Sequence, residues 1–135
     1  MKISLLTLFP EMFTGPFRYS IIKRAQTQKK LELNYVNLSD FGLGKYKQVD
    51  DRPYGGGVGM VMRVDVIAKA LKSIKEHSGS DPEGLSRSGG IDERIILLDP
   101  KGKKFNQSMA RRFSKLEHLI LICGHYEGVD ARVEK

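Results

Sequence analysis

The sequence is short of several features, and each shortage excludes a class of protein. Its 135 residues hold one cysteine, Cys123, which excludes a disulfide within the chain and a cysteine metal cluster and favours a reducing cytoplasm. No stretch approaches the roughly 20 apolar residues that a membrane-spanning helix needs. The apolar N-terminal run stops at Pro10 with no small-residue cleavage site behind it, so we predict a buried first strand rather than a signal peptide. We therefore expect a soluble, cytoplasmic protein that does not associate with membranes.

Positive charge is in excess, with a net charge of +7 and a pI near 9.6. Cationic surfaces attract phosphate backbones and release their counterions, but a lysine-rich solvated surface would give the same charge. One stretch between Pro100 and Leu116 contains basic residues and no acidic ones. This basic stretch, which we expect to be either a nucleic-acid footprint or a solvated surface, comprises Lys101, Lys103, Lys104, Arg111, Arg112 and Lys115.

Apolar periodicity predicts alternating strands and helices within one domain. Apolar residues at helical spacing follow the first strand and occur again over residues 66–74 and 109–116. Asn106 is expected to cap the helix at 109–116, and a further helix is expected from Val129 onward. The order predicts an α/β fold, a mainly parallel sheet flanked by helices. Strands are expected at residues 3–9, 31–38, 93–99 and 118–123. By composition, residues 39–62 are expected to form a long loop and residues 78–90 a flexible insertion.

The most unusual segment is the glycine-rich run at residues 50–62. Its glycines permit positive φ and let a ligand approach the backbone closely, but it matches neither a P-loop nor a dinucleotide fingerprint. It is therefore either a mobile linker or, as the flanking Asp50, Asp51 and Arg52 favour, a specific binding loop. The aspartates could act as a base or as metal ligands or simply be solvated, and Arg52 could pair with them or contact phosphate.

Two further loops are expected at the carboxyl ends of strands, where ligands gather in parallel sheets: residues 99–102 and 124–128. On the second, Tyr126 could stack on a flat ring and Glu127 could pair with an amino group. Arg132 could bind phosphate or pair with Asp130. Cys123, at the end of a buried strand, is expected to be a structural thiol rather than a nucleophile.

At this point the motifs resemble those of a known family. The stretches 51–62 and 123–130, the opening residues 3–13 and the segment 97–102 closely resemble the signature stretches of TrmD-type tRNA (guanine-N1)-methyltransferases. The resemblance covers the chain except the insertion, and it implies that residues 1–135 are an N-terminal S-adenosylmethionine-binding domain of the SPOUT fold, whose C-terminal part is threaded into a trefoil knot. It further implies a homodimer and methylation of guanine N1 beside the anticodon, in the anticodon stem-loop of tRNA. We assign no metal-binding residue.

The resemblance also assigns site residues. The segment 51–59 is similar to the family's substrate-side loop, which gives Asp51, Arg52, Pro53, Tyr54, Gly55, Gly56, Gly57 and Gly59 as substrate-binding residues. The donor contacts of the family fall on Leu97, Leu98, Asp99, Pro100, Gly124, Tyr126, Glu127 and Gly128.

Two departures from the family pattern bear on activity. Ala131 stands where the family usually has a glutamate. Family members continue well beyond Lys135, and that continuation completes the knot and supplies the aspartate base and an essential arginine. We therefore assign no catalytic residue, expect the fold to lack its knot-completing segment, and expect the isolated chain to be inactive. The alternatives are a nonenzymatic basic RNA-binding α/β domain and a nucleotide-binding protein of other chemistry, although neither phosphate motif is present.

Overall fold

A computed structural model of the chain describes residues 1–77 and 92–134; the predicted insertion at 78–90 lies outside the described residues. The chain divides into two compact units. The first, the sheet unit, comprises Met1–Val36 and Asp92–Cys123, and the second, the loop unit, comprises Asn37–Ile91 and Gly124–Lys135.

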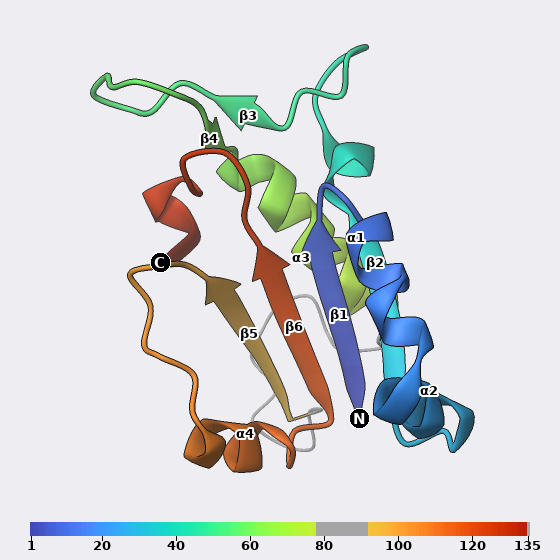
Figure 1. Cartoon of the computed structure of the whole chain (residues 1–135). Coiled ribbons are helices and arrows are strands. Elements are labelled where there is room, and N and C mark those ends of the chain that lie inside the picture. Colours follow the sequence, from blue (N-terminus) through green and yellow to red (C-terminus); the bar gives the residue numbers. More distant parts are fainter. Residues whose placement is uncertain (78–91, 135) are drawn as a thin grey trace. The chain divides into compact units, whose positions relative to one another are not determined.

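The sheet unit is built on a four-stranded sheet in the order β2-β1-β6-β5 (Figure 1). Its strands are β1 (Lys2–Thr7), β2 (Glu32–Asn37), β5 (Glu93–Leu98) and β6 (His118–Cys123). Both β1 and β5 pair with β6 in parallel, with Ser4 and Ile95 as the partners of Ile120. The predicted strands and the mainly parallel α/β architecture are therefore confirmed.

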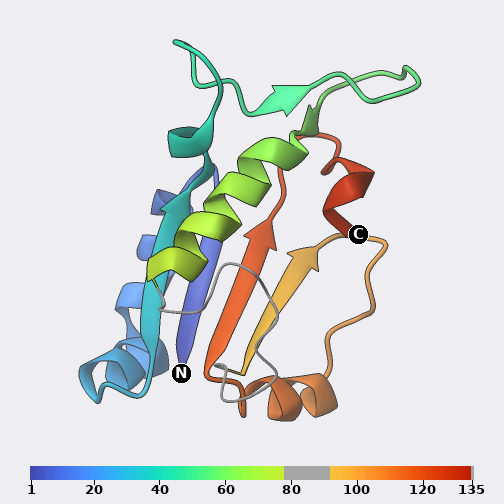
Figure 2. The ribbon, with the colours of Figure 1, turned by 180° about the vertical axis from the view of Figure 1, so that it is seen from behind.

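Short helices flank this sheet. After β1 the chain forms α1 (Glu11–Thr14), the 3₁₀ helix η1 (Pro16–Arg18) and α2 (Ser20–Thr27), and both views place α1 and α2 over one face at the β2 edge (Figures 1 and 2). The sequence predicted a single helix here. Pro16 lacks the N–H that would continue α1, and the extended backbone of Tyr19, with φ of −125° and ψ of 166°, separates η1 from α2.

The remaining helix of the sheet unit, α4 (Gln107–Phe113), begins where it was predicted. The side-chain oxygen of its cap, Asn106, accepts a hydrogen bond from the backbone N–H of Met109 at 2.9 Å. This satisfies one of the free N–H groups of the first turn. The predicted cap is therefore confirmed.

Burial in the sheet unit is greatest in its two central strands. Leu6 of β1 and Ile120 and Ile122 of β6 are almost completely buried, as near-continuous apolar strands predict. Strand β5 differs, because Ile95 is 40% and Leu98 52% exposed. The two-sided burial expected of a strand in a parallel sheet is therefore not found here. The reason is its position: among the described strands, β5 lies at the edge of the sheet and pairs with β6 alone.

The loop unit contains the hairpin strands β3 (Asp50–Asp51) and β4 (Val61–Met62), the helix α3 (Val64–His77) and the 3₁₀ helices η2 (Leu38–Phe41) and η3 (Ala131–Glu134). Its core combines Leu38 with Met62 of β4 and the inner face of α3, where Val66, Ile67 and Ala70 are buried. The helix predicted over residues 66–74 is confirmed.

Two expectations for the loop unit need correction. Residues 39–62 are not loop throughout, since Asp50 and Asp51 pair in antiparallel fashion with Met62 and Val61. The helix expected from Val129 onward begins at Ala131 and is a 3₁₀ helix. Val129 instead forms a parallel bridge with Met62, which keeps the chain extended up to the helix.

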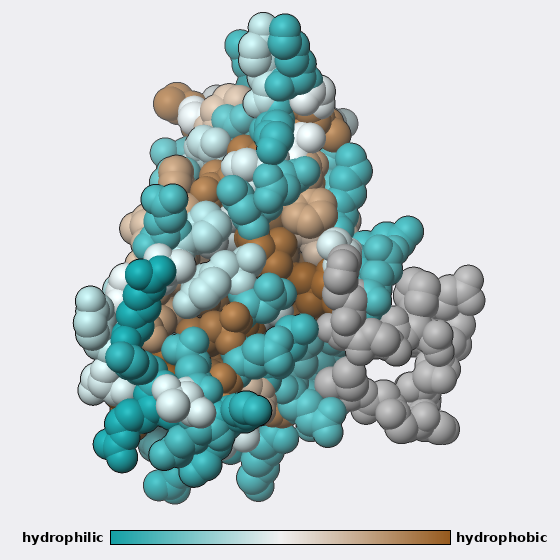
Figure 3. All heavy atoms as spheres, turned by 90° about the vertical axis from the view of Figure 1, so that its right-hand side faces the viewer, coloured by the Kyte–Doolittle hydropathy of each residue, from teal (hydrophilic) through white to brown (hydrophobic). Residues whose placement is uncertain are grey.

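Among residues 1–77 and 92–134, no helix combines the length and apolarity required to cross a membrane. Seen from the side of α2, the surface is mostly hydrophilic, with apolar atoms between the hydrophilic ones (Figure 3). The basic residues that follow the apolar positions of α2, such as Lys23, Arg24 and Lys29, are exposed. The surplus of positive charge is thus carried at the surface.

Candidate functional site

Two of the predicted site loops follow neighbouring strand ends. Leu98, the last residue of β5, is the register partner of Cys123, the last residue of β6. Beyond Leu98 the chain turns at once, because Asp99 Oδ1 accepts the N–H of Lys101 at 2.6 Å and Asp99 O accepts the N–H of Gly102 at 2.9 Å. The turn predicted at residues 99–102 is therefore present at the carboxyl end of a parallel strand.

A cavity of about 590 Å³ lies beside this turn within the sheet unit. Leu97, Leu98 and Asp99, three of the residues predicted to bind the donor, line it together with apolar side chains of α4, including Phe113. The fourth predicted residue of this segment, Pro100, is exposed. The wall is mainly apolar, which suits a flat or aliphatic ligand with few polar groups.

The second predicted loop, residues 124–128, is held by β4. The N–H of Met62 donates to Gly128 O at 2.9 Å, and the N–H of Glu127 donates to Met60 O at 3.1 Å. The N–H of Asp130 donates to Met62 O at 3.0 Å. The end of the glycine-rich segment and the loop after β6, which are far apart in sequence, are therefore joined through their backbones in one unit, a contact that no sequence pattern predicted.

Tyr126 occupies a sparsely populated backbone conformation on this loop. Its φ is +60°, which a residue with a side chain adopts at a cost unless its surroundings hold it. Its ring meets that of His125 edge-on, with centroids 5.1 Å apart. Burial raises the pKa of the Tyr126 phenol, and the charge of Asp50 adds to this. The hydroxyl therefore stays protonated at neutral pH and can donate a hydrogen bond.

The glycine-rich segment is the connection between β3 and β4. Each of its four glycines has a positive φ, from +86° to +135°, as expected of a backbone that needs glycine. Tyr54 and Val58 on this loop are fully exposed. The loop therefore extends from a short hairpin with its side chains in solvent.

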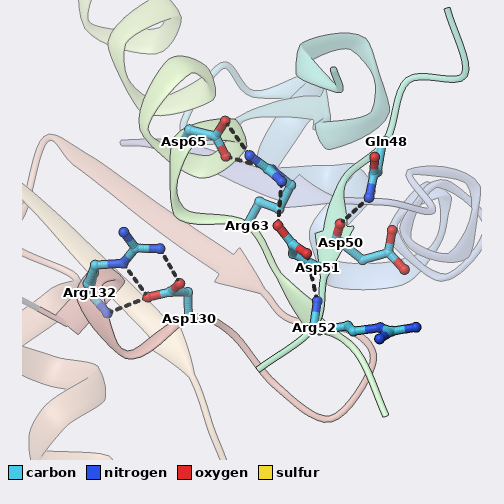
Figure 4. Close-up of polar contacts among 8 residues, drawn as sticks. All are labelled: Gln48, Asp50, Asp51, Arg52, Arg63, Asp65, Asp130 and Arg132. Atoms are coloured by element: carbon cyan, nitrogen blue, oxygen red, sulfur yellow. Dashed lines mark hydrogen bonds and ion pairs between the residues drawn. The ribbon is translucent and has the colours of Figure 1, made fainter. Parts of the chain in front are cut away.

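Arg63, which was not predicted as a site residue, binds two aspartates beside this hairpin. Arg63 Nη1 lies 2.6 Å from Asp51 Oδ2, and its Nε and Nη2 bind the two carboxylate oxygens of Asp65 at 3.0 and 3.2 Å (Figure 4). The hydrogen bond from Arg63 lowers the pKa of the Asp65 carboxyl. Asp51, considered above as a base, is therefore engaged in an ion pair. A basic residue two positions before Asp65, the acidic residue in the first turn of α3, was the only sequence signal for this contact.

The two other arginines near this loop behave differently from each other. Arg132 binds Asp130 through Nε and Nη2 at 2.9 and 2.6 Å, and the pKa of Asp130 falls to about 2, mainly because of this hydrogen bond. Of the two roles weighed for Arg132, pairing with Asp130 is the one observed. The Arg52 side chain has no ion-pair partner among the described residues and points away from both clusters in Figure 4. Both Arg52 and Arg132 line a cavity of about 570 Å³ with residues 51–55.

Cys123 is partly buried, and burial raises the pKa of its thiol. A raised pKa leaves less of the nucleophilic thiolate, in agreement with a structural role. Within the residues that the structure describes, no group of three or more His, Cys, Asp or Glu side chains could hold a metal ion.

The basic stretch lies on the connection between β5 and α4, on α4 and directly after it. Its members are exposed, and none has an ion pair with a carboxylate in the described part of the chain. The guanidinium of Arg112 lies 5.6 Å from the centre of the Phe113 ring, and that of Arg94 lies 5.9 Å from the same ring. Exposed, unpaired cations of this kind are available to a polyanion.

Comparison with known proteins places these features in a family. The family model described as tRNA (Guanine-1)-methyltransferase TrmD matches residues 1–135. The tRNA (guanine-N(1)-)-methyltransferase of Carboxydothermus hydrogenoformans is 48% identical over 135 residues, which are 100% of this chain and 48% of the relative. That of Enterococcus faecalis is 50% identical over 133 residues, 98% of this chain and 50% of the relative.

A solved structure agrees with the sequence relatives. The crystal structure of the tRNA (m1G37) methyltransferase from Aquifex aeolicus is similar with a TM-score of 0.81 at 34% identity, over 99% of this chain and 55% of that one. The chain thus spans about half the length of the relatives that it matches. With a family model that matches it from end to end, the chain belongs to the tRNA (guanine-1)-methyltransferase family.

Proposed function

We propose that this chain is part of an enzyme that transfers a methyl group from S-adenosylmethionine to N1 of the guanosine on the 3′ side of the tRNA anticodon, position 37. The observation that carries the proposal is the backbone contact between the glycine-rich segment and the loop at residues 124–128. These are the two signature stretches of the family, and a methyl transfer requires donor and acceptor to be held side by side.

The donor is proposed to bind the loops that follow β5 and β6. Support comes from the cavity of about 590 Å³, which falls within the usual size of small-molecule sites, and from the protonated phenol of Tyr126. S-adenosylmethionine would supply a methyl group activated by the positively charged sulfur. The residues proposed to contact it are Leu97, Leu98, Asp99, Pro100, Gly124, Tyr126, Glu127 and Gly128.

The glycine-rich loop is proposed to face the target base, through Asp51 to Gly57 and Gly59. Arg52 supplies a cation without an acidic partner in the described residues, as a phosphate contact requires. Tyr54 offers a fully exposed ring, and aromatic rings stack on unpaired bases of RNA loops. The exposed cations of α4 would contact the tRNA backbone without reading its sequence.

The methyl transfer also requires a base that accepts the proton of guanine N1. Methyl transfer is an in-line displacement: guanine N1 forms a bond to the methyl carbon, the carbon–sulfur bond breaks, and the N1 proton passes to a base. Of the acidic groups near the loop, Asp51 and Asp130 are held by arginines. We assign the base to neither, and propose that activity requires the half of the relatives that lies outside the match.

The proposal extends to assembly and setting. We propose that residues 1–135 form an S-adenosylmethionine-binding domain of SPOUT type, whose trefoil knot is completed in the full-length enzyme, that the enzyme is a homodimer and that it acts in the cytoplasm. Support for a dimer comes from large apolar side chains exposed near α1 and α2, namely Met12 at 71%, Tyr19 at 70% and Ile21 at 76%, which burial against a second copy would remove from water.

The first test is a calorimetric titration of S-adenosylmethionine into the 135-residue chain, with Tyr126→Ala as the comparison. Saturable binding that the variant loses would support the donor site and show that the described loops suffice for it. Absence of binding by the chain, and by the chain joined to the remaining half of the Carboxydothermus relative, would refute the donor assignment.

The second test separates the enzyme from a nonenzymatic RNA-binding domain. The joined protein is given labelled S-adenosylmethionine and a tRNA transcript with guanosine on the 3′ side of the anticodon, or the same transcript with adenosine there. Methylation of the first transcript alone is expected. Binding of both transcripts without methylation would favour the RNA-binding alternative.

A further inference from the structure

The carboxylate of Glu127 differs from its acidic neighbours in the loop unit. Asp51 and Asp65 share the guanidinium of Arg63, and Asp130 is bound by Arg132. Glu127 is exposed, and its carboxylate has no hydrogen-bond or ion-pair partner among the described residues. It is therefore available to an amino group of a ligand, for which a free carboxylate is the natural partner.

Although it is unpaired, Glu127 is not without support. Its backbone N–H donates to Met60 O at 3.1 Å, and the next residue, Gly128, accepts from Met62. The preceding residue, Tyr126, has a φ of +60°. A backbone that holds a side-chain-bearing residue in this region has to be fixed by its surroundings, and here the hydrogen bonds to residues 60–62 fix it.

The Glu127 side chain itself lies over the backbone of Gly59. A Cβ atom on Gly59 would lie 2.5 Å from Glu127 Cγ, 3.4 Å from Cδ and 3.6 Å from Oε1. A contact of 2.5 Å is far inside van der Waals distance, so any larger residue at position 59 would displace the glutamate. The absence of a side chain at Gly59 thus creates the space in which Glu127 lies.

We infer that Gly59 and Met60 are positioning residues: Met60 O fixes the backbone of Glu127, and Gly59 leaves the space that its side chain occupies, so that the carboxylate is presented to the amino group of a ligand. The inference rests on the proposed function only for the identity of that ligand. Gly59, which is proposed to bind the substrate, would then also determine the conformation of Glu127 on the loop proposed to bind the donor. Preorganisation of this kind reduces the cost of ordering a side chain when the ligand binds.

The chain contains a matched control for this inference. Gly55 has the same φ as Gly59, +92°, but no atom lies within 4 Å of the place where its Cβ would be. Gly55→Ala and Gly59→Ala therefore introduce the same side chain at the same backbone conformation, and only the second meets Glu127. Effects of backbone strain alone would appear in both variants.

The test is an NMR comparison of the 135-residue chain and these variants, without any ligand. In the wild-type chain, three-bond couplings should report a single χ1 rotamer for Glu127. Gly59→Ala should change that rotamer. Because the displaced side chain strains the loop whose Glu127 N–H donates to Met60 O, exchange of this amide should become faster by up to about tenfold. Gly55→Ala should leave both unchanged. A rotamer-averaged Glu127 in the wild type, or equal effects of the two variants, would overturn the inference.

The double variant Gly59→Ala/Glu127→Ala covers the case in which Gly59→Ala does not fold. Because it removes the atom that clashes, it should fold, and the exchange rate at the amide of residue 127 should match that of Gly55→Ala/Glu127→Ala, which carries the same backbone strain. A double variant as perturbed as Gly59→Ala would contradict the inference. Since none of these measurements involves S-adenosylmethionine or tRNA, a failure here is distinct from a failure of the proposed function, which the titration above decides.

Discussion

Strand β6 of the sheet unit and strand β4 of the loop unit contribute to the candidate site in different ways. Strand β6 has parallel neighbours on both sides and buries His118, Leu119, Ile120 and Ile122. Strand β4 has two residues, and its contact with the loop at 124–128 runs through Met62: its N–H donates to Gly128 O, and its buried Sδ accepts the N–H of His125 at 3.2 Å. The first is held by apolar burial and the second by hydrogen bonds, glycine conformations and ion pairs.

Apolar burial and surface ion pairs stabilise a fold by different amounts. Burial of one large aliphatic side chain in a central strand stabilises the folded state by about 1.5–3 kcal/mol. Ion pairs at the surface are worth about 0–1 kcal/mol each. The glycine-rich hairpin of the loop unit should therefore adjust more readily than the central strands of the sheet unit. Four substitutions test this contrast, from the strongest support to the weakest.

The largest effect is expected from Ile120→Ala. Ile120 is fully buried on β6, so truncation should lower the free energy of unfolding by about 2–5 kcal/mol, through lost burial and a cavity. Its register partner Ile95, on the edge strand and 40% exposed, provides the control, and Ile95→Ala should cost clearly less. Urea denaturation followed by circular dichroism measures both, and equal losses would contradict the distinction between central and edge strands.

A buried polar group in the same sheet gives the next effect. His118 is buried, with Nε2 2.9 Å from Ser4 Oγ and Nδ1 3.7 Å from Glu93 Oε2. Burial lowers the pKa of His118 below 6.5, and the charge of Lys2 lowers it further, against the opposing charges of Glu93 and Glu32. The folded state therefore prefers the neutral ring.

The pH dependence follows from this sign. The unfolded state takes up the proton first, so the stability contributed by neutral His118 is complete above pH 6.5 and is lost as pH falls from there through the folded pKa. Urea denaturation of the wild type at pH 7.5 and 5.5 should show a lower stability at pH 5.5. His118→Gln, which keeps a polar side chain but does not titrate, should lose that part of the decline; an equal decline in both would exclude His118 as its source.

Particular residues show how far sequence alone could lead. The strands β1, β5 and β6, the cap at Asn106 and the glycine conformations were predicted, because each depends on local periodicity or on one residue's own preference. The exposure of β5 was not, since an edge position depends on strand order. The contacts of Arg63 and of Glu127 over Gly59 escaped prediction for a related reason: they join residues through the fold, and a single sequence contains no distance.

A smaller effect is expected at the base of the hairpin. Arg63 binds Asp51 and Asp65 at once, and a lysine cannot reproduce this planar, branched geometry. Arg63→Lys should therefore speed amide exchange over residues 49–63 by a few fold, in line with the modest strength of exposed pairs. Arg52→Lys is the control, since Arg52 has no ion-pair partner among the described residues. Equal exchange in the two variants would mean that Arg63 does not hold the hairpin.

The smallest effect is expected at the ion pair between Asp130 and Arg132. Asp130→Asn removes the charge that binds Arg132, whose side chain is 70% exposed, so the unfolding equilibrium constant should change less than about fivefold. Because the folded pKa of Asp130 is lowered from 3.8 to about 2, its contribution is complete above pH 3.8 and is lost as pH falls through 2. The difference between variant and wild type should therefore be present at pH 6 and shrink below pH 3.8. Asp40→Asn, at an exposed pair with Lys47 in the same unit, is the reference. If Asp130→Asn lowered the free energy of unfolding as much as Ile120→Ala does, the loop unit would depend on its ion pairs as much as the sheet unit depends on its core.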